Sequence, residues 1–226
     1  SEGTLAFLAG VTMRTEREYE HKASAMVYFS DIGEASRAVV EMRKLQDAAG
    51  ERIVHSAEML DSKSLASVGD ATGEGLTAVL TETKAHTPEA LAANVARIGE
   101  LLERFALYVP ARFTDDPAEQ AKYWAVRSGI FPAVGGSRPA GTTCLIEDVA
   151  FHIEDLPRAT AELQALIARH GYDDACIYGH ALEDNYHFII NQSFSPPAEV
   201  ARYEALMNDV AELVVGRYDG SLKAEH

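Results

Sequence analysis

The stretch DDACIYGHALEDNYHFIINQ, residues 173–192, has two runs of β-forming residues on either side of the four residues ALED, 181–184. The first run ends at His180 and the second begins at Asn185, which predicts a β-hairpin with a short turn. Alternation along the second run assigns its residues to two faces: Asn185, His187 and Ile189 to one, and Tyr186, Phe188 and Ile190 to the other. His180 lies beside the first face, so the hairpin brings two imidazoles to one place.

Outward from this hairpin, hydrophobic periodicity predicts the same order of elements twice. The first set has strands at 24–31, 52–61 and 75–84, with helices at 34–48 and after Thr87-Pro88. The second has strands at 142–153, 173–180 and 185–192, with helices after Asp155 and after Ser195-Pro196-Pro197. Each set reads strand–helix–strand–strand–helix. We therefore predict an α+β fold of duplicated ferredoxin-like split βαβ units, with a mostly antiparallel sheet and helices packed on one face.

The chain is expected to be one domain over residues 1–226, with a first half at about 20–108 and a second half at 143–220. A long loop at 110–142, rich in proline and glycine, joins them, and only residues 117–130 within it could be helical. Long irregular connections in compact domains are usually functional loops or linkers, and Trp124 with its flanking arginines favours a functional loop. Both ends look cut, so we expect a fragment of a longer protein.

Composition excludes several classes of function. The formal charge is −15, from 35 acidic and 20 basic side chains, and there is no basic stripe, so nucleic-acid binding is not expected. No run of about 18 apolar residues could span a bilayer. The start lacks the basic region and cleavage site of a signal peptide. Cys144 and Cys176 are interpreted as reduced core thiols of a cytoplasmic protein, with a structural disulfide as the alternative.

The paired histidines leave two interpretations open. They could be ordinary hydrogen-bonded histidines, or they could share a divalent cation. The chain ends on Glu225-His226, and two His with one Glu and an open fourth position is the ligand set of catalytic zinc. A metal there would lower the pKa of a bound hydroxyl group, and His226 could take the proton. The alternative for Glu225-His226 is a charged, frayed terminus.

An acidic substrate would need an anion-binding group. Arg127 and Arg138 lie in the expected loop, and guanidinium groups suit carboxylates, although each could be a plain surface arginine. Glu147 and Asp148 are unusual inside an apolar strand, where they either pair with those arginines or face solvent.

Several stretches together resemble the C-terminal domain of FAD-linked oxidases of the D-lactate and D-2-hydroxyacid dehydrogenase type. The stretches are SEGTLAF at 1–7, WAVRSGIFPAVGG at 124–136, LIEDVAF at 145–151, GHALEDNYHF at 179–188 and YDGSLKAEH at 218–226. They cover essentially the whole chain in the family's order. The residues of these stretches are most similar to those of large bacterial members in which an iron–sulfur domain follows the flavin part.

The resemblance implies a role for individual residues. His180, His187 and Glu225 match the ligands of a divalent metal, zinc or manganese; His226 matches the base; Arg127 matches the arginine that holds the substrate carboxylate; Asn185 matches an asparagine near the flavin. Three departures leave the substrate open: Glu183-Asp184 replaces Asp-Gly, LIED has no lysine, and Ile189 replaces a polar residue.

The implied function is that of the substrate, or cap, domain of an FAD-dependent dehydrogenase that oxidises a D-2-hydroxy acid to the 2-oxo acid. FAD would be bound mainly by an upstream domain, and iron–sulfur clusters would lie downstream, so the isolated chain is expected to fold without holding FAD or turning over. The expected location is the cytoplasm, with peripheral attachment to the inner membrane in the full-length enzyme as a second option. The alternative is a non-catalytic α+β module that binds a small metabolite or dimerises, since this fold hosts unrelated functions.

Overall fold

The computed structural model describes residues 6–15, 18–70, 73 and 75–223. The first half contains β1 (His21–Phe29), α1 (Ile32–Arg43), β2 (Ser56–Leu60), α2 (Ser62–Ser67), β3 (Thr77–Ala85) and α3 (Pro88–Leu102). Helix α4 (Pro117–Ser137) leads to the second half, which contains β4 (Thr143–Ala150), α5 (Leu156–Arg169), β5 (Cys176–His180), β6 (Asn185–Gln192) and α6 (Pro197–Ala211). Short 3₁₀ turns lie at Ile153–Asp155 and Ala181–Glu183, and a π-helical segment, Glu212–Arg217, follows α6.

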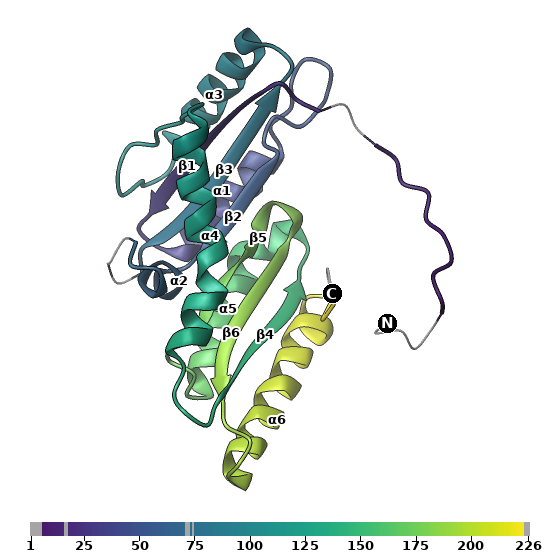
Figure 1. Cartoon of the computed structure of the whole chain (residues 1–226), viewed down its shortest axis with the longest axis vertical. Coiled ribbons are helices and arrows are strands. Elements are labelled where there is room, and N and C mark those ends of the chain that lie inside the picture. Colours follow the sequence, from purple (N-terminus) through teal and green to yellow (C-terminus); the bar gives the residue numbers. More distant parts are fainter. Residues whose placement is uncertain (1–5, 16–17, 71–72, 74, 224–226) are drawn as a thin grey trace.

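The described strands form one six-stranded sheet in the order β1-β3-β2-β5-β6-β4, and every neighbouring pair is antiparallel. The order of the second half mirrors that of the first, and the two halves meet where β2 pairs with β5 (Figure 1). We call this pairing the seam. The α+β class and the antiparallel sheet predicted from the sequence are confirmed.

Local sequence explains where the helices begin. Asp31, Asp61 and Thr87 each accept a hydrogen bond from a backbone N–H in the first turn of the helix that follows. Thr87 is followed by Pro88 at the first helical position, as expected from the sequence. Asp155 behaves differently, because a 3₁₀ turn precedes α5 and its side chain makes no capping bond.

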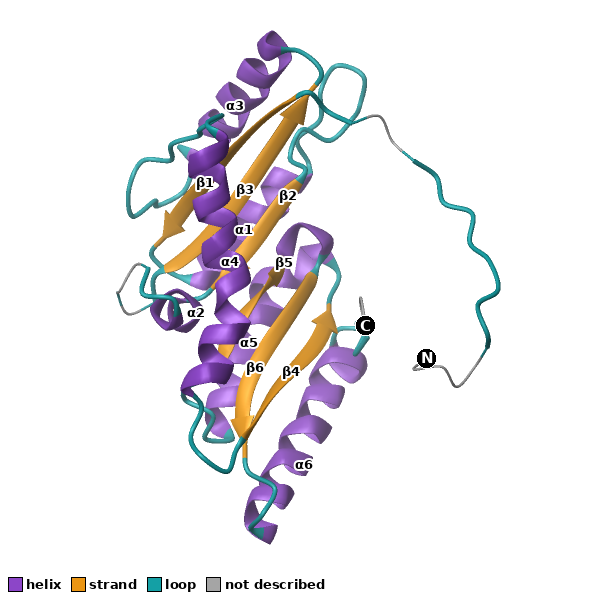
Figure 2. Cartoon of the chain, in the orientation of Figure 1, coloured by secondary structure: helices purple, strands orange, loops and turns teal. Residues whose placement is uncertain are grey.

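The sheet buries both of its faces. Helices α1, α3, α5 and α6 cover one face, where the largest apolar cluster joins residues of both halves, including Phe29, Met59, Tyr186 and Phe188. Helices α2 and α4 cover the other face with a second cluster that includes Leu60, Leu80 and Ile189, which corrects the expectation that the helices pack on one face only. Figure 2 shows α4 crossing the sheet on the side opposite to α1 and α5. We call this the α4 face.

The connection at 110–142 is largely helical, which corrects the expectation of a long irregular loop. Helix α4 runs from Pro117 to Ser137 and continues through Pro132, seven residues beyond the stretch considered helical. A proline inside a helix removes one backbone hydrogen bond and usually ends it. Here Ile130 and Val134, one turn apart on either side of the proline, are buried against the sheet. Packing on the α4 face therefore outweighs the local preference to break.

Residues 6–15 run as an extended segment beside the body of the molecule (Figure 1), and Phe7, Leu8 and Met13 expose 94%, 77% and 78% of their surface.

Cys144 and Cys176 are free thiols, as expected, and burial raises the pKa of Cys176 to about 12. Among the described residues, no helix has the length and apolar character needed to cross a membrane.

Candidate active site

The hairpin of β5 and β6 depends on two residues with unusual backbone conformations. Asp184 ends the turn in the left-handed region with φ 64°, and its carboxylate pairs with Arg43, which also donates to the carbonyl oxygen of Leu182 at 3.0 Å. Gly179 has φ 151°, and a Cβ there would lie 2.8 Å from the carbonyl oxygen of Asn185. A side chain at 179 would push the returning strand away, so the glycine permits the close approach that brings the hairpin's polar residues together.

The two histidines of the hairpin lie next to each other on the α4 face, as the alternation predicts. The centroids of the His180 and His187 rings are 5.6 Å apart, and the ring planes meet at 86°. Tyr178 is buried and packs its ring 5.5 Å from that of His187. Tyr186, Phe188 and Ile190 point into the core on the opposite face. The sheet thus holds two imidazoles in fixed positions on a half-buried surface.

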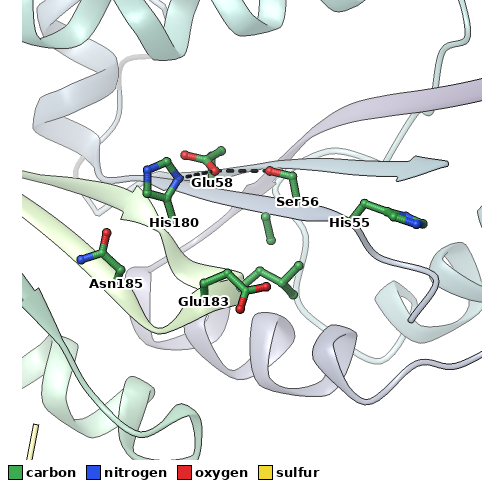
Figure 3. Close-up of a pocket in the computed structure, with 8 residues that line it drawn as sticks. His55, Ser56, Glu58, His180, Glu183 and Asn185 are labelled. Atoms are coloured by element: carbon green, nitrogen blue, oxygen red, sulfur yellow. Dashed lines mark hydrogen bonds and ion pairs between the residues drawn. The ribbon is translucent and has the colours of Figure 1, made fainter. Parts of the chain in front are cut away.

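Glu58 of β2 lies opposite His180 across the seam and was not singled out by the sequence. Its Oε1 lies 2.8 Å from His180 Nδ1, and its Oε2 accepts a hydrogen bond from Arg127 Nε at 2.9 Å. Figure 3 shows the Glu58 carboxylate and the His180 ring facing each other. Burial opposes ionisation of Glu58, but its contacts with His180 and then Arg127 outweigh burial and hold its pKa below the usual range.

Asp148 of β4 is the acidic neighbour of the second histidine. Its Oδ1 lies 3.4 Å from His187 Nδ1 and accepts a hydrogen bond from Asn185 Nδ2, which also donates to the carbonyl oxygen of Val149 at 3.1 Å. The neighbouring Glu147 accepts a hydrogen bond from Tyr203 at 2.7 Å. These contacts are with the hairpin and with Tyr203. They are not with Arg127 or Arg138, which was one of the two alternatives that the sequence left open for Glu147 and Asp148.

The two candidate anion-binding arginines lie in different surroundings. Arg127, in the middle of α4, keeps 18% of its side chain exposed, bonds Glu58, and places its guanidinium carbon 4.9 Å from the centroid of the Tyr178 ring. Arg138 follows the end of α4, is exposed, and donates to the carbonyl oxygens of Gly135 and Thr142. The structure brings Arg127, and not Arg138, to the histidines.

A pocket opens beside these residues at one end of the seam. It has a volume of about 460 Å³, within the range of small-molecule sites, and His55, Ser56, Glu58, His180, Glu183 and Asn185 line it (Figure 3). His55 points away from His180 in this view. Its Nδ1 accepts a hydrogen bond from the backbone N–H of Lys84 at 3.1 Å, which joins the residue before β2 to β3.

The chemistry of the donor atoms partly fits a divalent cation. His180 Nδ1 lies 2.8 Å from the Glu58 carboxylate, the arrangement that orients a metal-binding imidazole and directs coordination to Nε2, whereas His187 Nδ1 lies 3.4 Å from Asp148 and makes no hydrogen bond to it. Within residues 6–15, 18–70, 73 and 75–223, no group of three or more His, Cys, Asp or Glu side chains forms a metal site. A divalent cation bound by the two imidazoles would need a further ligand from outside the described residues.

The predicted third ligand Glu225 and the predicted base His226 lie outside the described residues. The described chain leading to them runs toward the site. Ser221 and Ala150 exchange two backbone hydrogen bonds of 2.8 and 2.9 Å, and Ala150 is the register partner of Asn185. The last described residues, up to Lys223, therefore lie at the end of β4 that is next to the hairpin.

Sequence reasoning missed two residues of this site that carried some signal. Glu58 interrupts the apolar side of a predicted strand, which is where a buried and paired charge is to be expected. Tyr178 precedes His180 by two and therefore shares its face. Neither could be joined to Arg127 from the sequence, because Glu58 and Tyr178 both meet it only where α4 packs on the folded sheet.

The chain is similar to a known protein family and to curated proteins. Residues 18–226 match the family model described as FAD linked oxidases, C-terminal domain. Two curated proteins named glycolate oxidase subunit GlcD, from Escherichia coli strain K12 and from Escherichia coli O6:H1 strain CFT073, are each 26% identical to the chain over 230 residues. The match covers 100% of this chain and 44% of each relative, so the chain spans less than half the length of these proteins.

Solved structures share the fold at low sequence identity. An alkyldihydroxyacetonephosphate synthase matches 90% of this chain and 40% of its own, with a TM-score of 0.60 and 12% identity. p-Cresol methylhydroxylase with substrate bound matches 91% and 45%, with a TM-score of 0.59 and 12% identity. The 4-ethylphenol oxidase of Gulosibacter chungangensis in its isoeugenol complex matches 86% and 44%, with a TM-score of 0.54 and 13% identity.

Proposed function

The chain belongs to the family of FAD linked oxidases, C-terminal domain, and from this membership we propose that it is the substrate domain of an FAD-dependent dehydrogenase acting on a D-2-hydroxy acid such as D-lactate. The product would be the 2-oxo acid. Support for a hydroxy acid comes from the printed name of the curated relatives, glycolate oxidase subunit, and glycolate is a 2-hydroxy acid. The observation that carries the proposal is the meeting of His180, His187 and Arg127 on one face beside a pocket.

Each polar group has a defined task in this proposal. The guanidinium of Arg127 binds the carboxylate of the substrate, because a planar fork of donors matches two carboxylate oxygens. The imidazoles of His180 and His187, together with Glu225, would hold a divalent cation, zinc or manganese, which would supply Lewis-acid polarisation of the hydroxyl group. His226 would receive the hydroxyl proton, and Asn185, which lines the pocket, is proposed to lie near the flavin.

The redox step belongs to the cofactor. When bound, FAD would supply the acceptor for the hydride from C2 of the hydroxy acid, and this domain would contribute binding, orientation and electrostatics. A separate upstream domain is proposed to bind most of the FAD, and iron–sulfur centres in a downstream part are proposed to take the electrons onward. The strongly exposed apolar side chains of Phe7, Leu8 and Met13 support contact with another part of such a protein.

Metal titration tests the proposal against the alternative of a small-metabolite-binding or dimerisation module. Calorimetric titration of the chain with Zn²⁺ or Mn²⁺ is expected to show one site, which His180→Ala and His187→Ala each abolish. His170→Ala is the matched control, because His170 lies at the end of α5 and pairs with Asp209 instead. Equal affinity in the wild type and in both hairpin variants would favour the binding module.

Activity is the second test and requires the FAD-bearing protein that contains this domain. It should convert D-2-hydroxy acids to 2-oxo acids, measured by reduction of an artificial electron acceptor, and should discriminate against the L enantiomers. The isolated chain should be colourless. A yellow preparation of the chain alone would show that the described domain binds FAD unaided.

A further inference from the structure

Glu58 is a buried charge in the apolar middle of the sheet, and its contacts extend to three elements. Only 5% of its side chain is exposed, and its neighbours Ala57, Met59 and Leu60 are buried and apolar. Burying an isolated carboxylate is costly, so a glutamate is retained at such a place only with strong partners. Glu58 lies in β2, where Ser56 Oγ of the same strand donates to its Oε1 at 3.3 Å (Figure 3), and its two charged or titratable partners come from β5 and α4.

The two oxygens of this carboxylate serve different partners. Oε1 faces His180 Nδ1 at 2.8 Å, and Oε2 accepts from Arg127 Nε at 2.9 Å. We propose that Glu58 is a positioning residue that fixes, through one carboxylate, both the imidazole proposed to hold the cation and the guanidinium proposed to hold the substrate carboxylate. The inference rests on the function proposed above and adds a residue from the first half of the chain to that site.

For His180, the carboxylate determines which nitrogen carries the proton. An ionised glutamate only accepts hydrogen bonds, so Nδ1 must be protonated, and the lone pair of the neutral ring is then on Nε2. The same bond holds the orientation of the ring. Glu58 would therefore prepare His180 for coordination before any cation binds.

For Arg127, the bond at Nε fixes the plane of the guanidinium. With Nε held by Glu58 and the guanidinium carbon 4.9 Å from the centroid of the Tyr178 ring, the terminal nitrogens are the donors that an incoming carboxylate would meet. The spacing between the substrate's carboxylate and hydroxyl groups is short, so the arginine and the histidine have to be held at a fixed separation. One shared carboxylate between them provides that constraint.

A carboxylate is the side chain that can accept from both partners at once. Glutamine has the same shape but a single acceptor oxygen, so in Glu58→Gln either His180 or Arg127 faces an NH₂ group. Aspartate keeps both oxygens and the charge but is shorter by one methylene group. The two substitutions therefore separate the number of acceptors from their reach.

The matched control is Glu82→Gln. Glu82 of β3 has 5% of its surface exposed, like Glu58 a buried glutamate of the same sheet. Its side-chain contacts are with Ser24 Oγ of β1 at 3.3 Å and Lys84 Nζ of β3 at 3.1 Å, and neither His180 nor Arg127 is among them, although its register partner in β2 is Ser56. A general effect of neutralising a buried glutamate should appear in both variants, whereas loss of positioning should appear only at Glu58.

Two measurements on the chain test the inference. Calorimetry with Zn²⁺ is expected to show affinity roughly 10- to 100-fold lower in Glu58→Gln, as is typical when a partner of a metal-binding histidine is removed, and affinity within about twofold of the wild type in Glu82→Gln. Imidazole ¹⁵N spectra of the metal-free chain, assigned with His180→Ala, should show the Nδ1–H form of His180 in the wild type and a mixture of tautomers in Glu58→Gln.

The outcomes distinguish the inference from the function on which it rests. Unchanged Zn²⁺ affinity and an unchanged His180 tautomer in Glu58→Gln, with binding abolished by His187→Ala, would overturn the positioning role and leave the proposed function intact. Zn²⁺ affinity that His187→Ala does not alter would overturn the metal site, and the ¹⁵N spectra would still report whether Glu58 sets the tautomer. If Glu58→Gln does not fold, Glu58→Asp takes its place, with lowered affinity supporting the role and unchanged affinity opposing it.

Discussion

The two halves of the sheet share a framework but differ in what they place on the α4 face. Across the seam, Glu58 pairs with His180 and Leu60 pairs with Tyr178, so the register is symmetric about a central pair of residues. A twofold rotation about that centre exchanges Leu60 with His180. Leu60 is fully buried in the apolar cluster under α4, whereas His180 lines the pocket.

The neighbouring strands repeat the contrast. Leu80 pairs with Glu58 in the first half, and His187 pairs with Tyr178 in the second, so the same rotation exchanges Leu80 with His187. Leu80 is completely buried and belongs to the apolar cluster. Leucines in one half thus correspond to imidazoles in the other. The stability of the framework comes largely from the opposite face, where one apolar cluster joins both halves, so the α4 face of the second half can carry polar groups.

The largest expected effect comes from breaking this contrast at Leu80 and His187. Leu80→Ala should lower the free energy of unfolding by about 2–5 kcal/mol, because it leaves a cavity in a packed cluster. His187→Leu, which gives the second half the residue type of the first, should cost much less stability and abolish metal binding. Urea denaturation and calorimetry measure the two effects. A loss in His187→Leu as large as that in Leu80→Ala would show that the histidine supports the core.

The next effect concerns the centre of the seam, where Gly179 pairs with Met59. Gly179→Ala should lower the free energy of unfolding by about 2–3 kcal/mol, since the new Cβ would meet the backbone of Asn185 at 2.8 Å in a conformation that suits glycine. Gly99→Ala in α3 is the control of opposite sign. Nothing lies within 4 Å of a Cβ there, so it should stabilise by about 0.5–1 kcal/mol. Equal effects would contradict the close approach.

Arg127 contacts a residue on each side of the seam, Glu58 and Tyr178, whereas Arg138 donates to backbone carbonyls near its own position. In the FAD-bearing protein, Arg127→Ala should lower kcat/KM for the hydroxy acid roughly 10- to 100-fold, the value of a hydrogen bond to a charged group. Arg138→Ala should stay within about twofold, because Arg138 is exposed and contacts backbone carbonyls. A comparable loss at Arg138 would support the substrate-binding role that the sequence predicted for it.

The order of the elements could be predicted because the hydrophobic period of a segment and the residues that begin or end it are local signals. The alternation at 185–192 and the Thr87-Pro88 start of α3 need no tertiary information, and both agree with the structure. Helix α4 could not be predicted at its full length, because Pro132 and several glycines indicate a break and only burial of Ile130 and Val134 on the sheet sustains it. The six-residue helix α2 was too short for its periodicity to register.

The site was predictable in the same measure. The approach of His180 and His187 follows from hairpin geometry, so the sequence contained it. The contact of Glu58 with both His180 and Arg127 depends on the seam between β2 and β5, and nothing local in either strand specifies that pairing. Chemistry carried by one hairpin is visible in a sequence, whereas chemistry assembled across the two halves appears only in the folded chain.

The smallest expected effect lies in the helices behind the sheet, where the halves are joined differently. In the second half, Asp209 of α6 accepts from His170 Nε2 at 2.8 Å and Arg169 at 3.2 Å. In the first half, Arg97 of α3 donates to the backbone carbonyl of Gln46, which does not titrate.

The hydrogen bond from His170, followed by that from Arg169, holds the pKa of Asp209 below its ordinary 3.8. The stabilisation is therefore complete above about pH 4 and is lost as pH falls through the lowered pKa of the folded state. The difference in urea midpoint between wild type and Asp209→Asn should accordingly shrink below pH 3.8, whereas that between wild type and Arg97→Ala should not change with pH. A constant difference for Asp209→Asn down to pH 2 would mean that the α5–α6 contact contributes nothing through charge, and that both halves hold their helices by apolar packing alone.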